Sequence, residues 1–213
     1  MLYKIPIETS ARHIHVSKKD FEKLFGPGRE LTVKKELSQP GQFLSGESLM
    51  VRGPRGTFER VSILGPFRNE TQVELSLTDT RYTGIEGVIR QSGHTKGTPG
   101  CELIGEYGSI TLDHGVIVAK RHIHMTPEES LQMGVRDNDN VCVITKSFER
   151  AMIFADVVVR VHPDFRLAMH VDTDEANAFS GDDNPYGMIV KLFDNRSYDM
   201  TMWMDELEQG IYR

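Results

Sequence analysis

The tetrapeptide Arg-His-Ile-His occurs twice in this chain, at residues 12–15 and again at residues 121–124. Residues i and i+2 of a β-strand point to the same face, so each copy would present two imidazoles side by side and turn its isoleucine into the opposite layer. Two such pairs predict two metal half-sites. The repetition also restricts the fold, because both copies have to occupy strands in equivalent surroundings.

The pattern of a helix start follows each copy. Ser17 has Asp20 three positions further on, and Thr126 has Glu129 at the same spacing. A hydroxyl residue followed at this distance by an acidic residue is typical of a capped helix N-terminus. The same order of a strand, a helix cap and a short helix thus occurs twice, which indicates an internal duplication of about a hundred residues.

Composition narrows the class of protein. The 213 residues are 38% hydrophobic and 26% charged, which is ordinary for a globular chain long enough for two small domains. The net charge of -6 argues against broad nucleic-acid binding. Cys101 and Cys142 lack a C-x-x-C spacing, which favours reduced intracellular thiols. With no secretory segment or apolar run of membrane-spanning length, the sequence predicts a cytoplasmic protein that binds neither nucleic acid nor membrane.

Short segments rich in Val, Ile, Thr and Phe recur between turn residues. They are Leu49–Val51, Val61–Leu64, Thr71–Thr78, Val116–Ala119, Val141–Thr145, Met152–Phe154 and Asp156–Val161. Their length and spacing favour compact β-rich units over alternating βαβ units. The predicted fold class is therefore mainly β, with two small β-barrel domains related by internal duplication, each with short helices.

We expect the first barrel domain over residues 1–90 and the second, with a C-terminal extension, over residues 116–213. Residues 91–115 would form the junction. The glycine-rich stretch from Gly87 to Gly100 favours either a linker or a loop that cradles phosphate.

The alternation of polar and apolar residues over 72–78 predicts a strand that carries Gln72, Glu74, Ser76 and Thr78 on one face. His170 occupies the comparable place near the end of the second unit. These two residues are therefore the natural third ligands. The predicted metal sites are His13, His15 and Glu74 for one, and His122, His124 and His170 for the other.

Imidazole and carboxylate ligands suit zinc, and the same ligands could take cobalt, manganese or iron. Three protein ligands leave an open position, which is typical of a catalytic site. Arg68 follows a Gly-Pro turn near Glu74, where a guanidinium could bind phosphate, and Lys34 and Lys35 could bind a second anionic group. Because no nucleophile motif is present, the residues favour direct transfer at the metals over a covalent enzyme intermediate.

From about Ser10 to about Asn184 the sequence resembles the PduL-type phosphotransacylases, also called phosphate propanoyltransferases. The motifs that carry this resemblance, in family order, are Ser-Ala-Arg-His-Ile-His, Gln-Pro-Gly-Gln-Phe, Leu-Gly-Pro-x-Arg, Thr-Gln-Val-Glu, Lys-Gly-Thr-Pro-Gly, Ala-x-Arg-His-Ile-His-Met and Met-His-x-Asp-Thr-Asp-Glu-Ala-Asn-Ala. The resemblance implies a dinuclear zinc site between two β-barrels. It also implies reversible transfer of a short acyl group between coenzyme A and inorganic phosphate, with acyl phosphate as the other partner.

Carried over by position, the resemblance assigns the two ligand sets named above to two zinc ions and Arg68 to phosphate. It places Ser10, Lys35, Gln42 and Asn177 near coenzyme A. A bound zinc would lower the pKa of the coenzyme A thiol, and the metals and the arginine would stabilise charge on the oxygens of the tetrahedral species.

Two features depart from the family pattern. Only nine residues precede Ser10, whereas many members carry an N-terminal extension that targets them to bacterial microcompartments. This favours a cytoplasmic role in acetate or propanoate metabolism. The tail beyond Asn184 extends further than in typical members, and it is either a packing strand and helix or a contact for a homo-oligomer.

Other classes of metalloprotein use similar ligands. A two-domain cupin-like enzyme also has His-x-His with a later Glu and His, although its glutamate follows on a continuing strand where this sequence predicts a helix. A binuclear metallohydrolase is a weaker match, and a non-catalytic zinc-binding module stays open. The sequence leaves open acetyl or propanoyl preference, physiological direction, oligomeric state and which zinc would bind the thiol.

Overall fold

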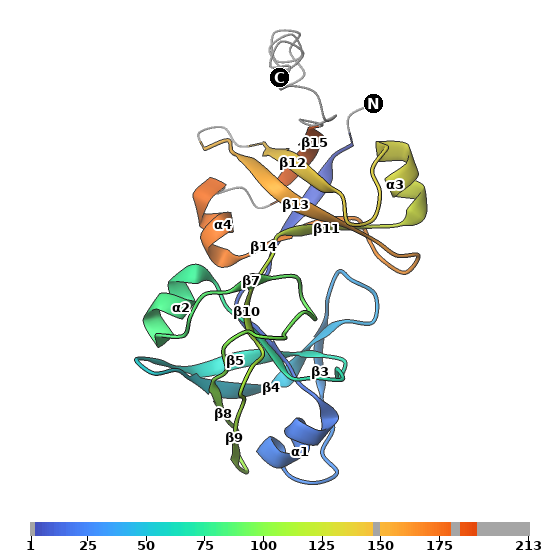
Figure 1. The fold of residues 1–213 in the computed structure, drawn as a ribbon. Coiled ribbons are helices and arrows are strands. Elements are labelled where there is room, and N and C mark those ends of the chain that lie inside the picture. The colour runs from blue at the N-terminus through green and yellow to red at the C-terminus, as the bar shows by residue number, and fades with distance from the viewer. Residues whose placement is uncertain (1–2, 147–149, 180–183, 191–213) are drawn as a thin grey trace.

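The computed structural model of the chain describes residues 3–146, 150–179 and 184–190, and it is mainly β, as predicted. Two bodies lie one above the other in Figure 1, a closed barrel and a curled half-barrel sheet. Four short helices accompany them in the described part of the chain.

Six strands close the barrel in the order β1-β14-β11-β13-β12-β15. Their bounds are Ile5–Thr9, Ala168–Val171, His122–Met125, Ile153–Val161, Asn140–Thr145 and Tyr186–Val190. The helices α3 (Pro127–Met133) and α4 (Thr173–Phe179) belong to this body. Apolar side chains such as Ile123 and Phe179 are buried in its core.

The half-barrel has the strand order β7-β10-β6-β2-β5-β4-β8-β9, and β3 pairs with β4 beside this path. Their bounds are β2 His13–His15, β3 Val33–Glu36, β4 Phe43–Arg52, β5 Thr57–Gly65, β6 Gln72–Glu74, β7 Ile89–Arg90, β8 Glu102–Ile104, β9 Ser109–Thr111 and β10 Val116–Ala119. Helices α1 (Lys18–Phe25) and α2 (Leu77–Thr83) pack with this sheet, whose separate core includes Ile14 and Phe21.

The chain crosses between the two bodies directly before each Arg-His-Ile-His. β1 is a barrel strand and β2 a half-barrel strand, whereas β10 is a half-barrel strand and β11 a barrel strand (Figure 1). The strand pairing crosses the expected division, because β1 from residues 1–90 pairs in the barrel and β10 from residues 116–213 pairs in the half-barrel. β8 and β9, which lie in the expected junction 91–115, also pair in the half-barrel. The two crossings carry both histidine pairs to the boundary between the bodies.

The predicted strand Thr71–Thr78 is too long. β6 ends at Glu74, and Ser76 instead begins α2 with a capping box, in which the Asp79 N–H donates to Ser76 Oγ and the Ser76 N–H donates to Asp79 Oδ2. Local capping outweighs the alternation here because it satisfies amides that a helix start leaves without partners. Ser76 and Thr78 therefore do not share a strand face with Glu74.

The other local predictions fit the structure. Ser17 and Thr126 accept hydrogen bonds from the N–H groups of Asp20 and Glu129, as the caps of α1 and α3. The segments Met152–Phe154 and Asp156–Val161 are joined in the single strand β13, in which Asp156 has a φ of 55°.

The first part of the C-terminal tail is strand β15, which pairs with β1 and β12 and closes the barrel. Residues 191–213, with the predicted helix and Trp203, lie outside the described residues. Within the described ranges, no helix has the length and apolar character needed to cross a bilayer. The predicted cytoplasmic location stays a prediction.

Candidate active site

The two predicted ligand sets occupy equivalent positions in the two bodies. β2 pairs antiparallel with β6, which places His13 opposite Glu74, and β11 pairs antiparallel with β14, which places His122 opposite His170. Directly opposed residues of an antiparallel pair project to the same face. The strand register thus brings together in each body the ligands that the sequence repeat predicts.

In the first cluster, three ligand side chains converge. His13 Nε2 lies 3.1 Å from His15 Nε2 and 3.5 Å from Glu74 Oε2, and His15 Nε2 lies 3.9 Å from Glu74 Oε1. Two ligands of a tetrahedral zinc, each 2.0–2.1 Å from the ion, would lie about 3.3 Å apart. The spacing of these atoms therefore fits a zinc-sized ion.

Hydrogen bonds fix the tautomers of both imidazoles in this cluster. His13 Nδ1 donates to the carbonyl of Ala11 at 2.9 Å, and His15 Nδ1 donates to the carbonyl of Leu64 at 3.2 Å. A neutral imidazole that donates from Nδ1 carries a lone pair on Nε2. Burial and the neighbouring His13 lower the pKa of His15 to about 3, so His15 is neutral at pH 7. The Nε2 lone pair of the neutral His15 faces His13 Nε2 at 3.1 Å, a separation that a shared proton or a shared metal ion can bridge.

Polar neighbours hold Glu74 in place. Gln72 Nε2 and Ser92 Oγ donate to Glu74 Oε1 at 2.6 and 2.7 Å, and Gly93 N–H donates to Gln72 Oε1 at 2.7 Å. Burial acts to raise the pKa of Glu74, but the neighbouring histidines, the hydrogen bond from Ser92 and the charge of Arg68 hold it well below its usual range. Glu74 is therefore an oriented carboxylate whose Oε2 faces His13.

The second cluster consists of three imidazoles whose ligand atoms lie within 4.8 Å of one another. His122 Nδ1 donates to the carbonyl of Lys120 at 2.9 Å, which repeats the bond from His13 to Ala11. Nδ1 of His124 is buried and finds no hydrogen-bond partner among the described residues. Burial, with repulsion from neighbouring imidazoles, lowers the pKa of His122 to about 4 and that of His124 to about 2. Neutral imidazoles are the form that binds metal.

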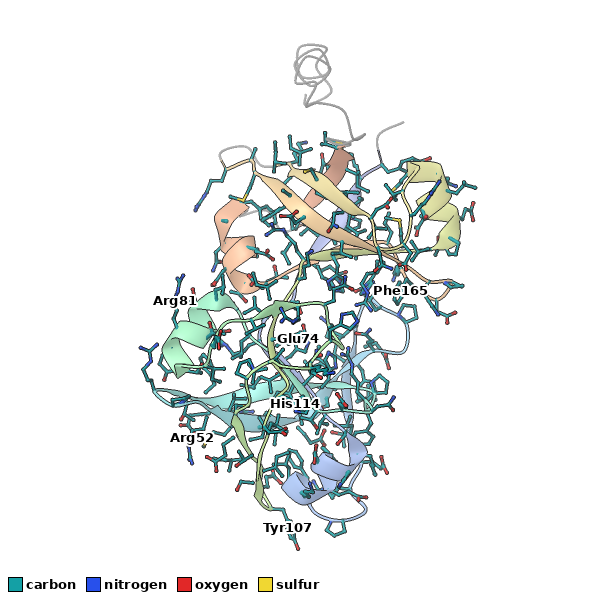
Figure 2. The ribbon with its side chains drawn as sticks, viewed as in Figure 1. Arg52, Glu74, Arg81, Tyr107, His114 and Phe165 are labelled. Atoms are coloured by element: carbon teal, nitrogen blue, oxygen red, sulfur yellow. The ribbon has the colours of Figure 1, made fainter. Side chains whose placement is uncertain are left out.

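A cavity of about 680 Å³ contains both clusters. Figure 2 shows Glu74 where the half-barrel meets the barrel, with Phe165 on the barrel side. Arg68 and Arg160 also line the cavity, as do Arg12 and Lys35, so its wall combines potential metal ligands with four basic side chains. Such an arrangement can bind an anionic substrate next to a metal-bound group.

Comparison with known proteins agrees with this arrangement. The family model for phosphate propanoyltransferase matches residues 6–182. The chain belongs to the phosphate propanoyltransferase family. Its relatives include the phosphate propanoyltransferase of Enterococcus faecalis, 50% identical over 185 residues that cover 87% of each chain. The phosphate propanoyltransferase of Thermotoga maritima is 51% identical over 82% of this chain and 83% of its own, and that of Salmonella typhimurium is 48% identical over 85% and 86%.

Membership of the phosphate propanoyltransferase family shows that this chain is an acyltransferase and supports acyl transfer between coenzyme A and phosphate. Among the residues that the resemblance places near coenzyme A, Ser10, Lys35 and Gln42 line the cavity. Asn177 lies on α4, is exposed, and is not among the described residues that line it.

The structure shows four roles at the site that the sequence did not indicate. Ser92 and Gln72 orient Glu74, and Glu8 accepts a hydrogen bond from His170 Nε2 at 3.1 Å. Arg160 is the fourth addition, and one signal could have indicated it: a single arginine interrupts a run of valines in β13.

Proposed function

We propose that this chain reversibly transfers a short acyl group, propanoyl or acetyl, between coenzyme A and inorganic phosphate at a dinuclear zinc site. Family membership supports the reaction class. The observation that carries the metal part is the convergence of the Nε2 atoms of His13 and His15, which lie 3.1 Å apart beside the carboxylate of Glu74.

The residues present fit zinc ions. The residues that would hold one zinc are His13, His15 and Glu74, and those that would hold the other are His122, His124 and His170. When bound, zinc supplies Lewis-acid charge and lowers the pKa of a coordinated thiol. The lowered pKa values keep His15, His122 and His124 neutral at pH 7, which is the form of imidazole that binds metal.

Other cavity residues bind and orient the substrates. Arg68 donates to Ser92 Oγ at 2.9 Å, which directs its guanidinium along the cavity beside Glu74 and leaves other N–H groups for a phosphoryl oxygen. Lys35, Gln42 and Ser10 form a polar part of the wall that suits the phosphates and amides of coenzyme A. Asn177 stays a prediction from the resemblance alone.

In the direction that forms acyl phosphate, an oxygen of phosphate attacks the thioester carbonyl carbon. A carbon–oxygen bond forms, the carbon–sulfur bond breaks, and coenzyme A leaves as a thiolate. Arg68 would neutralise part of the phosphate charge, which lowers repulsion as the two reactants approach, and would hold the attacking oxygen in position. The reverse reaction uses the same contacts.

The test mixes purified protein with acetyl phosphate or propanoyl phosphate and coenzyme A, and follows thioester formation before chelation, after chelation and after zinc is restored. We expect turnover that chelation abolishes and zinc rescues. His13→Gln is expected to abolish it as well, whereas His114→Gln, at an exposed histidine outside both clusters, should leave it unchanged. A folded, zinc-loaded protein that forms no thioester from either substrate would contradict the proposal.

A further inference from the structure

Arg160 belongs to the same cavity but comes from the other body than Arg68. It lies on β13 in a run of buried valines, and β13 pairs parallel with β11 so that Arg160 is the register partner of His124. Partners in adjacent strands project to the same face, so the guanidinium emerges on the face that carries the second histidine cluster. The side chain lines the cavity.

The guanidinium of Arg160 makes no hydrogen bond and no ion pair with any residue in the described ranges. The guanidinium lies near an aromatic ring, since Cζ is 5.9 Å from the centroid of Phe165, whose ring in turn lies 4.3 Å from that of His124. Burial lowers the pKa of Arg160, while Glu74 and Asp137 raise it from a distance. The five N–H donors of a half-buried guanidinium need acceptors. Since no described protein group supplies one, water or a ligand has to do so.

Arg68 faces the same space. Both arginines line the one cavity, and burial and repulsion from Arg160 lower the pKa of Arg68 while Glu74 raises it. The charged residues that line the cavity are four basic ones (Arg12, Lys35, Arg68 and Arg160) and three acidic ones (Glu8, Glu36 and Glu74), so the two arginines supply half of its positive charge and leave it with a positive excess. Such a place favours a doubly charged anion.

The two repeats differ at this position. Continuing the register of β2 with β5, in which Ile14 pairs with Ile63, places Leu64 beside His15 where the second repeat has Arg160 beside His124. Leu64 lines the cavity without a charged or polar side chain, and its carbonyl accepts a hydrogen bond from His15 Nδ1. The duplicated framework therefore needs no arginine here, and packing alone does not account for Arg160.

We propose that Arg160 and Arg68 together bind one phosphoryl group in the cavity, with Arg160 on the side of the second histidine cluster. The inference deepens the proposed function and rests on it for the identity of the substrate. Inorganic phosphate, acyl phosphate and coenzyme A all carry phosphoryl groups, so the test has to separate these sources.

The test titrates zinc-loaded protein with inorganic phosphate, and separately with coenzyme A, in a calorimeter without turnover. The variants are Arg160→Gln and Arg160→Lys, with Arg136→Gln as the control at an exposed arginine of the same body. Loss of a charge-assisted hydrogen bond weakens binding by about tenfold or more. We therefore expect Arg160→Gln to raise the Kd for inorganic phosphate by about tenfold or more, Arg160→Lys by less, and Arg136→Gln by under about twofold.

A rise confined to coenzyme A would support the phosphoryl site and assign it to the phosphates of coenzyme A. No change beyond about twofold for either ligand, in variants whose thermal unfolding matches that of the wild type, would overturn the inference. A double-mutant cycle combines Arg160→Gln with Arg68→Gln. If the double variant raises the Kd by less than the product of the two single-variant factors, the two arginines contact one shared group. If the factors multiply, the two arginines act independently, which would overturn the shared site. The Kd values are measured without turnover. Absence of acyl transfer would therefore contradict the proposed function without changing the conclusion on phosphoryl binding by the two arginines.

Discussion

Arg12 donates a hydrogen bond from Nη2 to Oδ1 of Asp79 across 2.7 Å. This bond ties the segment before β2, which carries His13, to the helix that follows β6. The second repeat has the same link, since Arg121 Nη1 lies 2.7 Å from Oε1 of Glu175 on α4. The arginine of each Arg-His-Ile-His thus connects a histidine strand to the helix after the strand that carries the third ligand.

Replacing Arg12 with methionine should reduce the free energy of unfolding by about 1–2 kcal/mol, because Asp79 is buried and would lose a charged donor. Urea titration measures the loss. Arg52→Met removes a similar 2.8 Å ion pair with Glu102, but there both side chains are partly exposed, and we expect under about 1 kcal/mol. Equal losses in the two variants would contradict a structural role for the Arg12 link.

Metal content tests the two ligand sets separately. We expect about two zinc ions per chain in the zinc-loaded protein, and about one in His13→Gln or in His122→Gln, since each variant removes one ligand of a three-residue set. Elemental analysis after dialysis measures this. A single variant that loses both ions, while still folded, would show that the clusters do not bind independently.

Ser92 orients Glu74 without belonging to either ligand set. Its hydroxyl donates to Glu74 Oε1 at 2.7 Å, so Ser92→Ala should weaken zinc binding at the first cluster by roughly 10–100-fold, the usual effect of losing a hydrogen bond to a ligand. Competition with a chelator of known affinity gives the value. Ser109→Ala, at an exposed position of β9, should leave zinc affinity unchanged.

Asp20 should make stability depend on pH. Burial acts to raise its pKa, but hydrogen bonds from Thr71, Lys23 and Ser17 outweigh burial and lower the pKa below its ordinary value of 3.8. A carboxyl with a lower pKa in the folded state stabilises the fold above its unfolded pKa, and this contribution is lost as pH falls below 3.8 through the folded value.

We therefore expect Asp20→Asn to lower the free energy of unfolding at pH 7 and to bring variant and wild type closer together below pH 3.8. Urea titration at several pH values measures the difference. Glu106→Gln, at an exposed loop position, should follow the wild type throughout. A constant gap between Asp20→Asn and wild type at every pH would contradict the assignment.

Both cysteines should be unreactive in the native protein. Cys101 and Cys142 are buried free thiols, and burial raises the pKa of Cys101 to about 12 and also raises that of Cys142. Thiolate is the reactive form, so a disulfide reagent at pH 8 should label neither thiol until the chain is unfolded, and then both. Rapid labelling of the native protein would contradict the buried positions.

The sequence by itself determined the local features of the site. A two-residue period places His13 and His15 on one face, and a hydroxyl with an acid three positions later begins a helix, because both depend on neighbours along the chain. Comparison of the two repeats then indicated Glu74 and His170 as third ligands. The structure places each in register with a histidine.

Only the tertiary structure decided what faces the ligands from elsewhere. The crossings of the chain after β1 and after β10, the bond of Ser92 to Glu74, and the meeting of Arg160 and Arg68 in one cavity all depend on which distant strands pair and in what register. A strand's own pattern specifies its buried face but not its partner. The residues that complete the cavity were therefore set by pairing across the two bodies, which no short stretch of sequence records.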